Sequence, residues 1–354
     1  MRRIAMLANI VAVLLAGDIA MGGNTTAALH AAKKAKKDEF YTQRVDIENE
    51  LRHYKAHFNG KTVLCNCDDP RQSEFFKYFV ENFEKLGLKK LVATCYKSQD
   101  VDLFSQGDCE KAICQIYEGD KNGNMRMDDD EINIRQLKGD GDFRSAECIE
   151  ILKEADIVVT NPPFSLFREY VAQLVKFDKK FLIIGNQNAI TYKEIFPLLM
   201  NNKLWIGYKF GDMAFKVPPD SEPRETRYWQ DETGQKWRSM GNVCWYTNLD
   251  HEKRHETLPL YKKYTPEEFP KYDNYDAINV NKTSDIPYDY DGVMGVPITF
   301  MDKYNPEQFE IIGATESEGK GFSAGLWNPD SGIAQATING AKVYKRIFIR
   351  RRSK

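Results

Sequence analysis

The clearest indication of the fold in this 354-residue chain is the stretch Asp156–Phe164 (DIVVTNPPF). Residues 157–160 are all apolar or β-branched, which is typical of a strand buried on both faces of a sheet. The strand ends at Asn161–Pro163 because proline cannot donate a hydrogen bond to a neighbouring strand. A helix at 165–177 and another apolar strand at 181–184 are expected to follow. The segment thus predicts the order strand, turn, helix, strand.

The same alternation extends to both sides of this stretch. Apolar runs bounded by Gly, Pro and Asp indicate strands, and phenylalanines at helical spacing indicate the first helix. The expected elements are strands at 62–67, 91–95 and 243–247, helices at 73–86 and 145–153, and a hairpin over 111–138 around Asn122-Gly123. Strands separated by helices are typical of a sheet with helices on both faces. We therefore expect an α/β fold with a doubly wound, mostly parallel, Rossmann-like sheet.

Composition describes a globular chain. The 50 Lys and Arg residues against 52 Asp and Glu residues give 50 − 52 = −2 as the formal net charge. A hydrophobic content of 42% with 29% charged residues argues against a disordered chain and a multi-pass membrane protein. The charge balance also excludes a polycation that coats nucleic acid, so such a partner would need a local basic face.

The composition changes along the chain. Residues 21–252 contain the alternating strands and helices, whereas residues 253–354 are rich in Tyr, Pro and Asp and end in a basic tail. We expect a larger α/β domain over 21–252 and a smaller, irregular C-terminal region over 253–354. Residues 1–20 form an N-terminal extension that belongs to neither.

The sharpest chemical signal is Asn161-Pro162-Pro163-Phe164 at the carboxyl end of a strand, where ligands bind in doubly wound sheets. The prolines leave neighbouring carbonyls available as acceptors, and Asn161 adds an amide oxygen. Phe164 adds a flat apolar face. This combination suits a planar ring with an exocyclic amine. The alternative interpretation is a rigid turn in which Asn161 caps the following helix.

The Asn161–Phe164 motif resembles the catalytic motif of amino-methylating DNA methyltransferases. The chain as a whole, from Met21 to its C-terminus, is similar to the EcoRI-type adenine-specific DNA methyltransferase family. The segments that carry this resemblance are Asp38–Gln43, Cys65–Pro70, Gly139–Ser145, Asn161–Phe164 and Gly241–Trp245.

The resemblance implies a cofactor site for S-adenosylmethionine. Phe40, Tyr41 and Thr42 match the segment that covers the methionine end of the cofactor. Asp68, Asp69 and Pro70 replace the usual glycine-rich loop, and either carboxylate can accept from the cofactor's ammonium. Asp142 and Phe143 match the pair that binds the adenine of the cofactor, although a plain Gly-Asp-Gly turn is the alternative. The second strand ends at Thr94–Tyr96 without the usual acid for the ribose hydroxyls.

The resemblance also implies the reaction. A target adenine must leave the duplex before its N6 amine can be methylated. Asn161 and the Pro162 carbonyl would accept from the amine, and Phe164 would stack on the flipped base, so the expected catalytic residues are Asn161, Pro162, Pro163 and Phe164. The partner is double-stranded DNA, no metal is required, and a cognate restriction endonuclease and a monomeric state are expected. The alternatives are a methyltransferase of RNA or protein glutamine, and a silent relative that only binds nucleic acid.

DNA contacts are expected mainly from a loop at 216–242. It interleaves aromatic and basic side chains, of which Arg224, Arg227, Lys236 and Arg238 are the candidates for DNA binding. The C-terminal region would supply target recognition. The basic runs Lys33–Lys37 and Arg346–Lys354 contact phosphates or are merely solvated.

Two metal-binding patterns compete with this interpretation. His251–His255 matches the HExxH pattern of zinc proteases, but Pro259 limits any helix there. Asp120–Glu131 has the ligand spacing of a calcium loop, but Met125 stands where that loop needs glycine. We expect a solvated basic turn and a polar hairpin tip, respectively.

The first residues have the layout of a secretory signal peptide, with Arg2 and Arg3 before the apolar run Ile4–Gly17. A short anchor and an over-long reading frame whose true start is Met21 are the alternatives. Because the expected substrate is DNA, we predict that residues 1–20 are dispensable and that the protein is cytoplasmic. The seven cysteines contain no Cys-x-x-Cys pair, which favours reduced, buried thiols.

Overall fold

A computed structural model describes residues 41–96, 112–124, 128–217, 223, 225–316 and 321–352. The predictions for residues 1–20, Phe40, Lys33–Lys37 and Arg224 lie outside these ranges. The main sheet has ten strands in the order β1-β8-β10-β7-β6-β2-β3-β4-β5, with β9 paired to β10. The strands are β1 (Tyr41–Thr42), β2 (Thr62–Asn66), β3 (Lys90–Thr94), β4 (Ile113–Tyr117), β5 (Ile132–Gln136), β6 (Ile157–Thr160), β7 (Lys180–Asn186), β8 (Trp205–Lys216), β9 (Tyr228–Gln230) and β10 (Lys236–Thr247).

The sheet is mixed and not mostly parallel as expected, because parallel pairing is confined to its centre. β2 pairs in parallel with β3 and with β6, and β6 pairs in parallel with β7. The pairs at both sides, including β10 with β7 and β3 with β4, are antiparallel. The predicted hairpin around Asn122-Gly123 is confirmed as β4 and β5.

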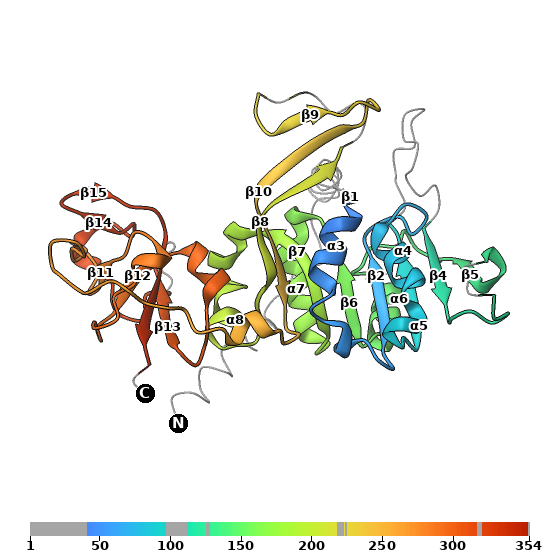
Figure 1. Ribbon diagram of the computed structural model, residues 1–354, viewed down its shortest axis with the longest axis horizontal. Coiled ribbons are helices and arrows are strands. Elements are labelled where there is room, and N and C mark those ends of the chain that lie inside the picture. The colour runs from blue at the N-terminus through green and yellow to red at the C-terminus, as the bar shows by residue number, and fades with distance from the viewer. Residues whose placement is uncertain are drawn as a thin grey trace, which may run out of the picture.

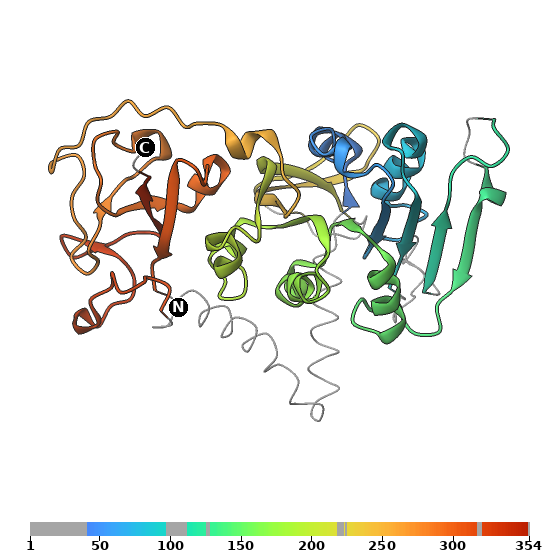
Figure 2. The same cartoon turned by 90° about the horizontal axis from the view of Figure 1, so that it is seen from below.

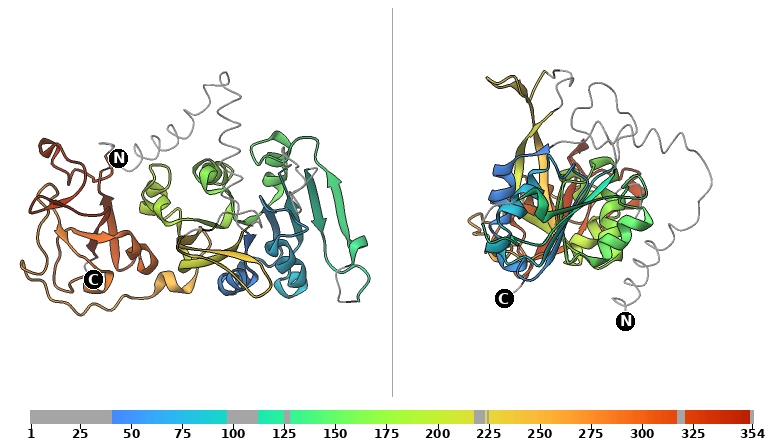
Figure 3. Two further views of the ribbon diagram at one scale, coloured as in Figure 1. Left: turned by 90° about the horizontal axis from the view of Figure 1, so that it is seen from above. Right: turned by 90° about the vertical axis from the view of Figure 1, so that its right-hand side faces the viewer.

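Helices cover both faces, which confirms the doubly wound α/β fold (Figure 1; Figure 3, right). One face carries α3 (Arg44–Leu51), α4 (Glu74–Glu81) and α5 (Phe83–Leu86), and the other carries α6 (Ala146–Glu154), α7 (Phe167–Lys176) and α8 (Phe196–Met200). Alternate residues of each central strand enter the two cores, because side chains point to opposite faces of a strand. In β6, for example, Ile157 and Val159 pack on the first face and Val158 on the second.

The antiparallel edge carries a projecting feature that the sequence did not predict. Residues 236–242, expected in a loop, form the first half of β10 and pair with β8 and β9. We call β9 and residues 236–242 the arm. Figure 1 shows the arm standing out from the rest of the sheet. The alternation of apolar residues is interrupted there by Lys, Arg and Ser, which hid the strand.

The C-terminal region forms separate, smaller sheets at one end of the molecule (Figure 2). The larger sheet has four strands in the order β11-β12-β16-β13, and a two-stranded sheet lies beside it. Their bounds are β11 (Ile278–Asn279), β12 (Met294–Pro297), β13 (Phe309–Ala314), β16 (Arg346–Arg351), β14 (Thr337–Ile338) and β15 (Ala341–Lys342). Residues 346–351 are therefore a strand and not a basic tail, because Ile347, Phe348 and Ile349 are fully buried.

Two further expectations need correction. The helix predicted over 73–86 is interrupted at Asn82, whose side chain donates to the carbonyl of Tyr78. Cys65, Cys67, Cys114, Cys148 and Cys244 are free, as predicted, whereas Cys95 is disulfide-bonded. None of the helices described here combines the length and the apolar character needed to cross a bilayer.

Candidate active site

The two polar clusters predicted from the sequence lie at the carboxyl ends of neighbouring strands. β2 leads into Asp68–Pro70, and β6 leads into Asn161–Phe164. The Thr160 hydroxyl hydrogen-bonds the carbonyl of Asn66, which ties the two strand ends together. Asn161 is 8% exposed, and Phe164 begins the short helix η4 (Phe164–Leu166).

The turn after β2 distinguishes its two carboxylates. Asp69 is almost fully buried and accepts from the backbone and guanidinium of Arg71, the closest contact being 2.7 Å. Asp68 accepts from the Ser73 hydroxyl at 3.3 Å. Burial raises the pKa of Asp68 to about 7; the Ser73 hydrogen bond opposes this shift and the charge of Asp69 adds to it. Cys67, just before them, has φ of 85°, a conformation in which glycine is more usual.

Asp142 and Phe143 lie beside the carboxyl end of β3. Gly141 has φ of 80°, and a Cβ there would lie 2.1 Å from the carbonyl oxygen of Cys95. Only glycine therefore allows this turn to approach the strand so closely. Arg144 binds both oxygens of Asp142, at 2.9 and 2.6 Å. Burial would raise the pKa of Asp142, but the side-chain and backbone hydrogen bonds of Arg144 outweigh it and lower the pKa.

Helix α7, which follows the Asn161–Phe164 motif, holds Phe143 in place. Gln173 Nε2 donates to the Phe143 carbonyl at 2.9 Å. The Tyr170 ring packs edge-on against the Phe143 ring at 5.0 Å. The Tyr170 hydroxyl in turn hydrogen-bonds Asn66 Oδ1 at the end of β2.

Of the segment Phe40–Thr42, the structure describes the Tyr41 backbone and Thr42. β1 pairs with Phe215 and Lys216 of β8 and lies beside α4, the helix that follows Asp68–Pro70. Thr42 is 3% exposed, and its Oγ1 has no hydrogen-bond partner among the described residues. A buried hydroxyl without a partner is costly unless a ligand or water satisfies it.

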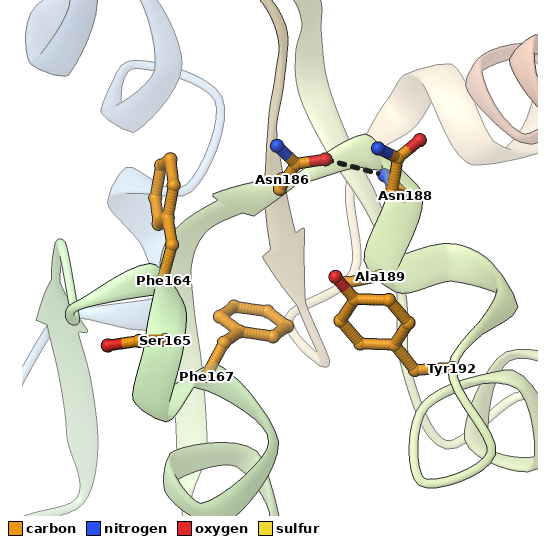
Figure 4. A pocket seen from close by; sticks show the side chains of 7 residues that line it. All are labelled: Phe164, Ser165, Phe167, Asn186, Asn188, Ala189 and Tyr192. Carbon is orange, nitrogen blue, oxygen red and sulfur yellow. Dashed lines mark hydrogen bonds between the residues drawn. The ribbon is translucent and has the colours of Figure 1, made fainter. Parts of the chain in front are cut away.

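A cavity of about 230 Å³ opens beside Phe164 (Figure 4). It is lined from the turn after β6 by Phe164, Ser165 and Phe167, and from the end of β7 and the segment after it by Asn186, Asn188, Ala189 and Tyr192. Sequence reasoning missed the second group. The available signal was the polar run Asn186–Asn188 directly after a buried strand, in the same position as the two clusters that were recognised.

The described candidate DNA-binding residues lie on the arm or directly beside it. Lys236 and Arg238 are half-buried on β10, and the exposed Arg227 ion-pairs with Asp212 at 3.8 Å. Trp229 and Trp237 stack with nearly parallel rings 6.3 Å apart, and Trp229 remains 42% exposed.

The two metal-like patterns adopt other arrangements. His251 is buried, its Nε2 hydrogen-bonds the Ile206 carbonyl, and burial lowers its pKa to about 4. His255 instead pairs with Asp250, so the two histidines have separate partners. In the hairpin, the Asp128 carboxylate accepts from the side chains of Asn122 and Asn124. Across the described residues, no group of three His, Cys, Asp or Glu side chains is placed to hold a metal ion.

A doubly wound sheet with acidic residues after β2 and Asn-Pro-Pro-Phe after the neighbouring β6 defines the class of protein: an α/β methyltransferase that acts on an amino nitrogen. Comparison with known proteins narrows the class. Residues 28–352 match the family described as adenine-specific methyltransferase EcoRI. The chain therefore belongs to this family and is a DNA adenine methyltransferase.

Three curated relatives agree with this assignment. Type II methyltransferase M.EcoRI of Escherichia coli is 53% identical over 330 residues, covering 92% of this chain and 97% of the relative. M.MgeORF184P of Mycoplasma genitalium is 37% identical over 90% of this chain and 97% of its own length. M.MpnI of Mycoplasma pneumoniae is 39% identical over 79% of this chain and 83% of its own length. No solved structure gives a significant match.

Proposed function

We propose that this protein transfers a methyl group from S-adenosylmethionine to the N6 amine of an adenine that is flipped out of duplex DNA. The observation that carries the proposal is the adjacency of β2 and β6. The candidate cofactor residues follow one strand and the candidate amine-binding residues follow the other. A donor and an acceptor bound at neighbouring strand ends can meet without any large movement of the protein.

The residues around the carboxyl ends of β2 and β3 fit the cofactor. Its sulfonium centre would supply the reactive methyl group. Asp68 would hold the ammonium group of the cofactor, because Asp69 is already engaged by Arg71. The buried Thr42 hydroxyl has no hydrogen-bond partner among the described residues, which supports the proposal that a polar ligand binds beside α4.

Asp142 and Phe143 would bind the adenine of the cofactor. The Phe143 ring is fixed from one side by Tyr170. Although Arg144 occupies both oxygens of Asp142, a carboxylate has about four acceptor positions and can also accept from an amine.

The Asn161–Phe164 motif would bind the target base. The amide oxygen of Asn161 and the carbonyl of Pro162 would accept hydrogen bonds from the two N–H groups of the amine. These hydrogen bonds would increase the electron density on the amine nitrogen. Pro163 would keep the turn rigid, because its ring restricts φ. Phe164 borders the cavity and would stack on the base. Positioning is then the main contribution of the protein to the reaction.

Double-stranded DNA would lie along the carboxyl edge of the main sheet and contact the arm. Arg224, Arg227, Lys236 and Arg238 remain our candidates for phosphate or groove contacts. A monomeric, cytoplasmic protein and a cognate restriction endonuclease with the same target sequence are part of this proposal. The relatives are named Type II methyltransferases, which supports a role in restriction and modification.

Methyl incorporation into duplex DNA, RNA and protein, measured in parallel with labelled S-adenosylmethionine, tests the proposal. We expect incorporation into duplex DNA as N6-methyladenine. Asn161→Ala should nearly abolish turnover while cofactor and DNA binding persist, because it removes an acceptor and leaves the rest of the turn unchanged. Incorporation into RNA or protein alone, or normal turnover by Asn161→Ala, would contradict the proposal.

A further inference from the structure

The Asn186 side chain has a fixed orientation at the edge of the cavity. Its Oδ1 accepts from the backbone N–H of Asn188 at 2.8 Å and thereby caps the helix η5 (Gln187–Thr191). Its own carbonyl accepts from the Tyr246 hydroxyl at 2.8 Å. Because Oδ1 accepts this capping hydrogen bond, the other terminal atom of the Asn186 side chain is the donor nitrogen, Nδ2.

This donor is available to a ligand. Within the described part of the chain, Asn186 Nδ2 donates no hydrogen bond, and Asn186 lines the cavity together with Phe164. Figure 4 shows the Nδ2 end of Asn186 directed to the side where Phe164 stands. A half-buried donor at the rim of a cavity that also holds the aromatic rings of Phe164, Phe167 and Tyr192 is a feature that orients a planar ligand.

Asn186 also lies at the same edge of the sheet as Asn161. β6 and β7 are paired in parallel with Thr160 opposite Ile183, so both strands end toward this edge. Asn161 directly follows the first strand and Asn186 ends the second. The cavity therefore lies between Phe164–Phe167, which directly follow the acceptor-rich turn of Asn161–Pro163, and a donor on the next strand.

We propose that Asn186 is a specificity-determining residue whose Nδ2 donates to a ring nitrogen of the target adenine. The inference rests on the proposed function. The adenine amine is flanked by two ring nitrogens, N1 and N7, and both are acceptors. The acceptors of the Asn161-Pro162 turn would bind the amine, and the donor of Asn186 would bind a ring nitrogen beside it. Guanine has a carbonyl oxygen at the position of the amine and would not fit these acceptors.

The close packing beneath the cavity supports a preformed pocket. A Cβ on Gly185 would lie 2.5 Å from the Phe167 ring, so glycine allows that ring to lie directly against β7. The Phe167 ring also packs at 5.0 Å from Tyr246, the residue that holds the Asn186 backbone. On the opposite side, the Arg168 guanidinium lies 4.2 Å from the Tyr192 ring. These contacts restrain the cavity walls before any base enters.

The test compares Asn186→Asp with Asn186→Ser. Both keep an oxygen that can cap η5 and both remove the amide nitrogen Nδ2; the hydroxyl of serine ends at the shorter Oγ position. We expect kcat/KM for DNA to fall roughly tenfold to a hundredfold, with cofactor affinity and melting temperature close to those of the wild type. Asn201→Ala is the matched control: Asn201 is an exposed asparagine at the end of α8 and does not line the cavity, so its truncation should have little effect on kcat/KM.

Modified substrates identify the interaction itself. Duplexes with 7-deazaadenine or 1-deazaadenine at the target position each lack one ring acceptor. One of them should lower wild-type kcat/KM by a similar factor and should cause no further loss in Asn186→Ser. Equal losses of kcat/KM in the wild type and Asn186→Ser for both analogues, or equal effects of Asn186→Ser and Asn201→Ala, would overturn the inference. If the proposed function itself were wrong, the wild type would not methylate unmodified adenine in DNA at all.

Discussion

Val243 on β10 lies directly opposite Asn186, the last residue of β7. Because β10 runs antiparallel to β7, the residues of β10 before Val243 continue past the carboxyl edge of the parallel strands. These residues belong to the arm, and the edge that they pass carries Asn161–Phe164 and the cavity. We therefore expect a DNA duplex that presents a base to this edge to contact the arm.

We expect Lys236→Ala and Arg238→Ala to weaken DNA binding at low salt and to leave kcat at saturating DNA largely unchanged. The slope of log K against log salt should fall by about 0.9 for each phosphate contact that is lost. Fluorescence anisotropy with a labelled duplex over a range of salt concentrations measures both effects.

Lys89→Ala is the control for nonspecific loss of charge. Lys89 is exposed and precedes β3, at the opposite edge of the sheet. Identical salt slopes for Lys89→Ala and the two arm variants would show that the arm makes no phosphate contacts.

Phe164→Ala should weaken capture of the extruded base. Phe164 borders the cavity, and stacking of a base on an aromatic ring is worth about 1–3 kcal/mol. The fluorescence increase of 2-aminopurine at the target position should be lost in this variant. Phe164→Trp keeps an aromatic face and should retain more activity and more of the signal. A full 2-aminopurine signal with Phe164→Ala would mean that the base is held elsewhere.

Asp142→Ala should weaken cofactor binding by roughly tenfold to a hundredfold, because a hydrogen bond to a charged group contributes about 1.5–3 kcal/mol. Isothermal titration calorimetry measures this directly. Arg144→Ala distinguishes two roles of Asp142, since it removes the ion pair and leaves the carboxylate. If Asp142 contacts the cofactor, the Arg144→Ala variant should bind the cofactor more tightly than the Asp142→Ala variant. Equal losses would indicate that Asp142 acts only by holding Arg144.

The central fold could be predicted because its strands are continuous apolar runs. Residues 157–160 are all buried, and a short β-branched run that ends at prolines is typical of a strand buried on both faces. The arm could not be predicted, because a projecting strand has no buried face to impose alternation; its pairing with β8 and β9 is a long-range property. Asn82 interrupts an otherwise continuous apolar helix pattern through one side-chain hydrogen bond, which periodicity does not reveal.

The candidate site also contains some residues that the sequence predicts and others that it does not. Asp68 and Asn161 stand directly after apolar strands, so the rule that ligands bind at carboxyl ends identifies them. The far wall of the cavity at Asn186–Tyr192 depends on which strand lies next to β6, and a single sequence does not give that order. The engagement of Asp69 by Arg71 likewise follows from the turn geometry after β2.

Asp68→Asn should affect stability and cofactor binding in opposite directions. Burial raises the folded-state pKa of Asp68 to about 7, so the folded protein binds a proton there that the unfolded chain releases at lower pH. The stability associated with this proton is present below the ordinary carboxyl pKa and is lost as pH rises toward about 7. Asparagine has no charge to bury. The variant should therefore melt at a similar temperature to the wild type at acidic pH and at a higher one above pH 7.

Cofactor binding should show the reverse preference. If Asp68 holds the ammonium group of the cofactor, as we propose, that charge would favour the ionised form of Asp68, so wild-type affinity should increase with pH through the pKa of about 7. Asp68→Asn should bind more weakly and lose this pH dependence. Asp69→Asn is the comparison, because it disturbs the contacts with Arg71 and should destabilise the turn at neutral pH. Thermal melts and calorimetric titrations across pH 5 to 9 measure both properties, and an unchanged pH profile of cofactor affinity in Asp68→Asn would assign the ammonium group to another residue.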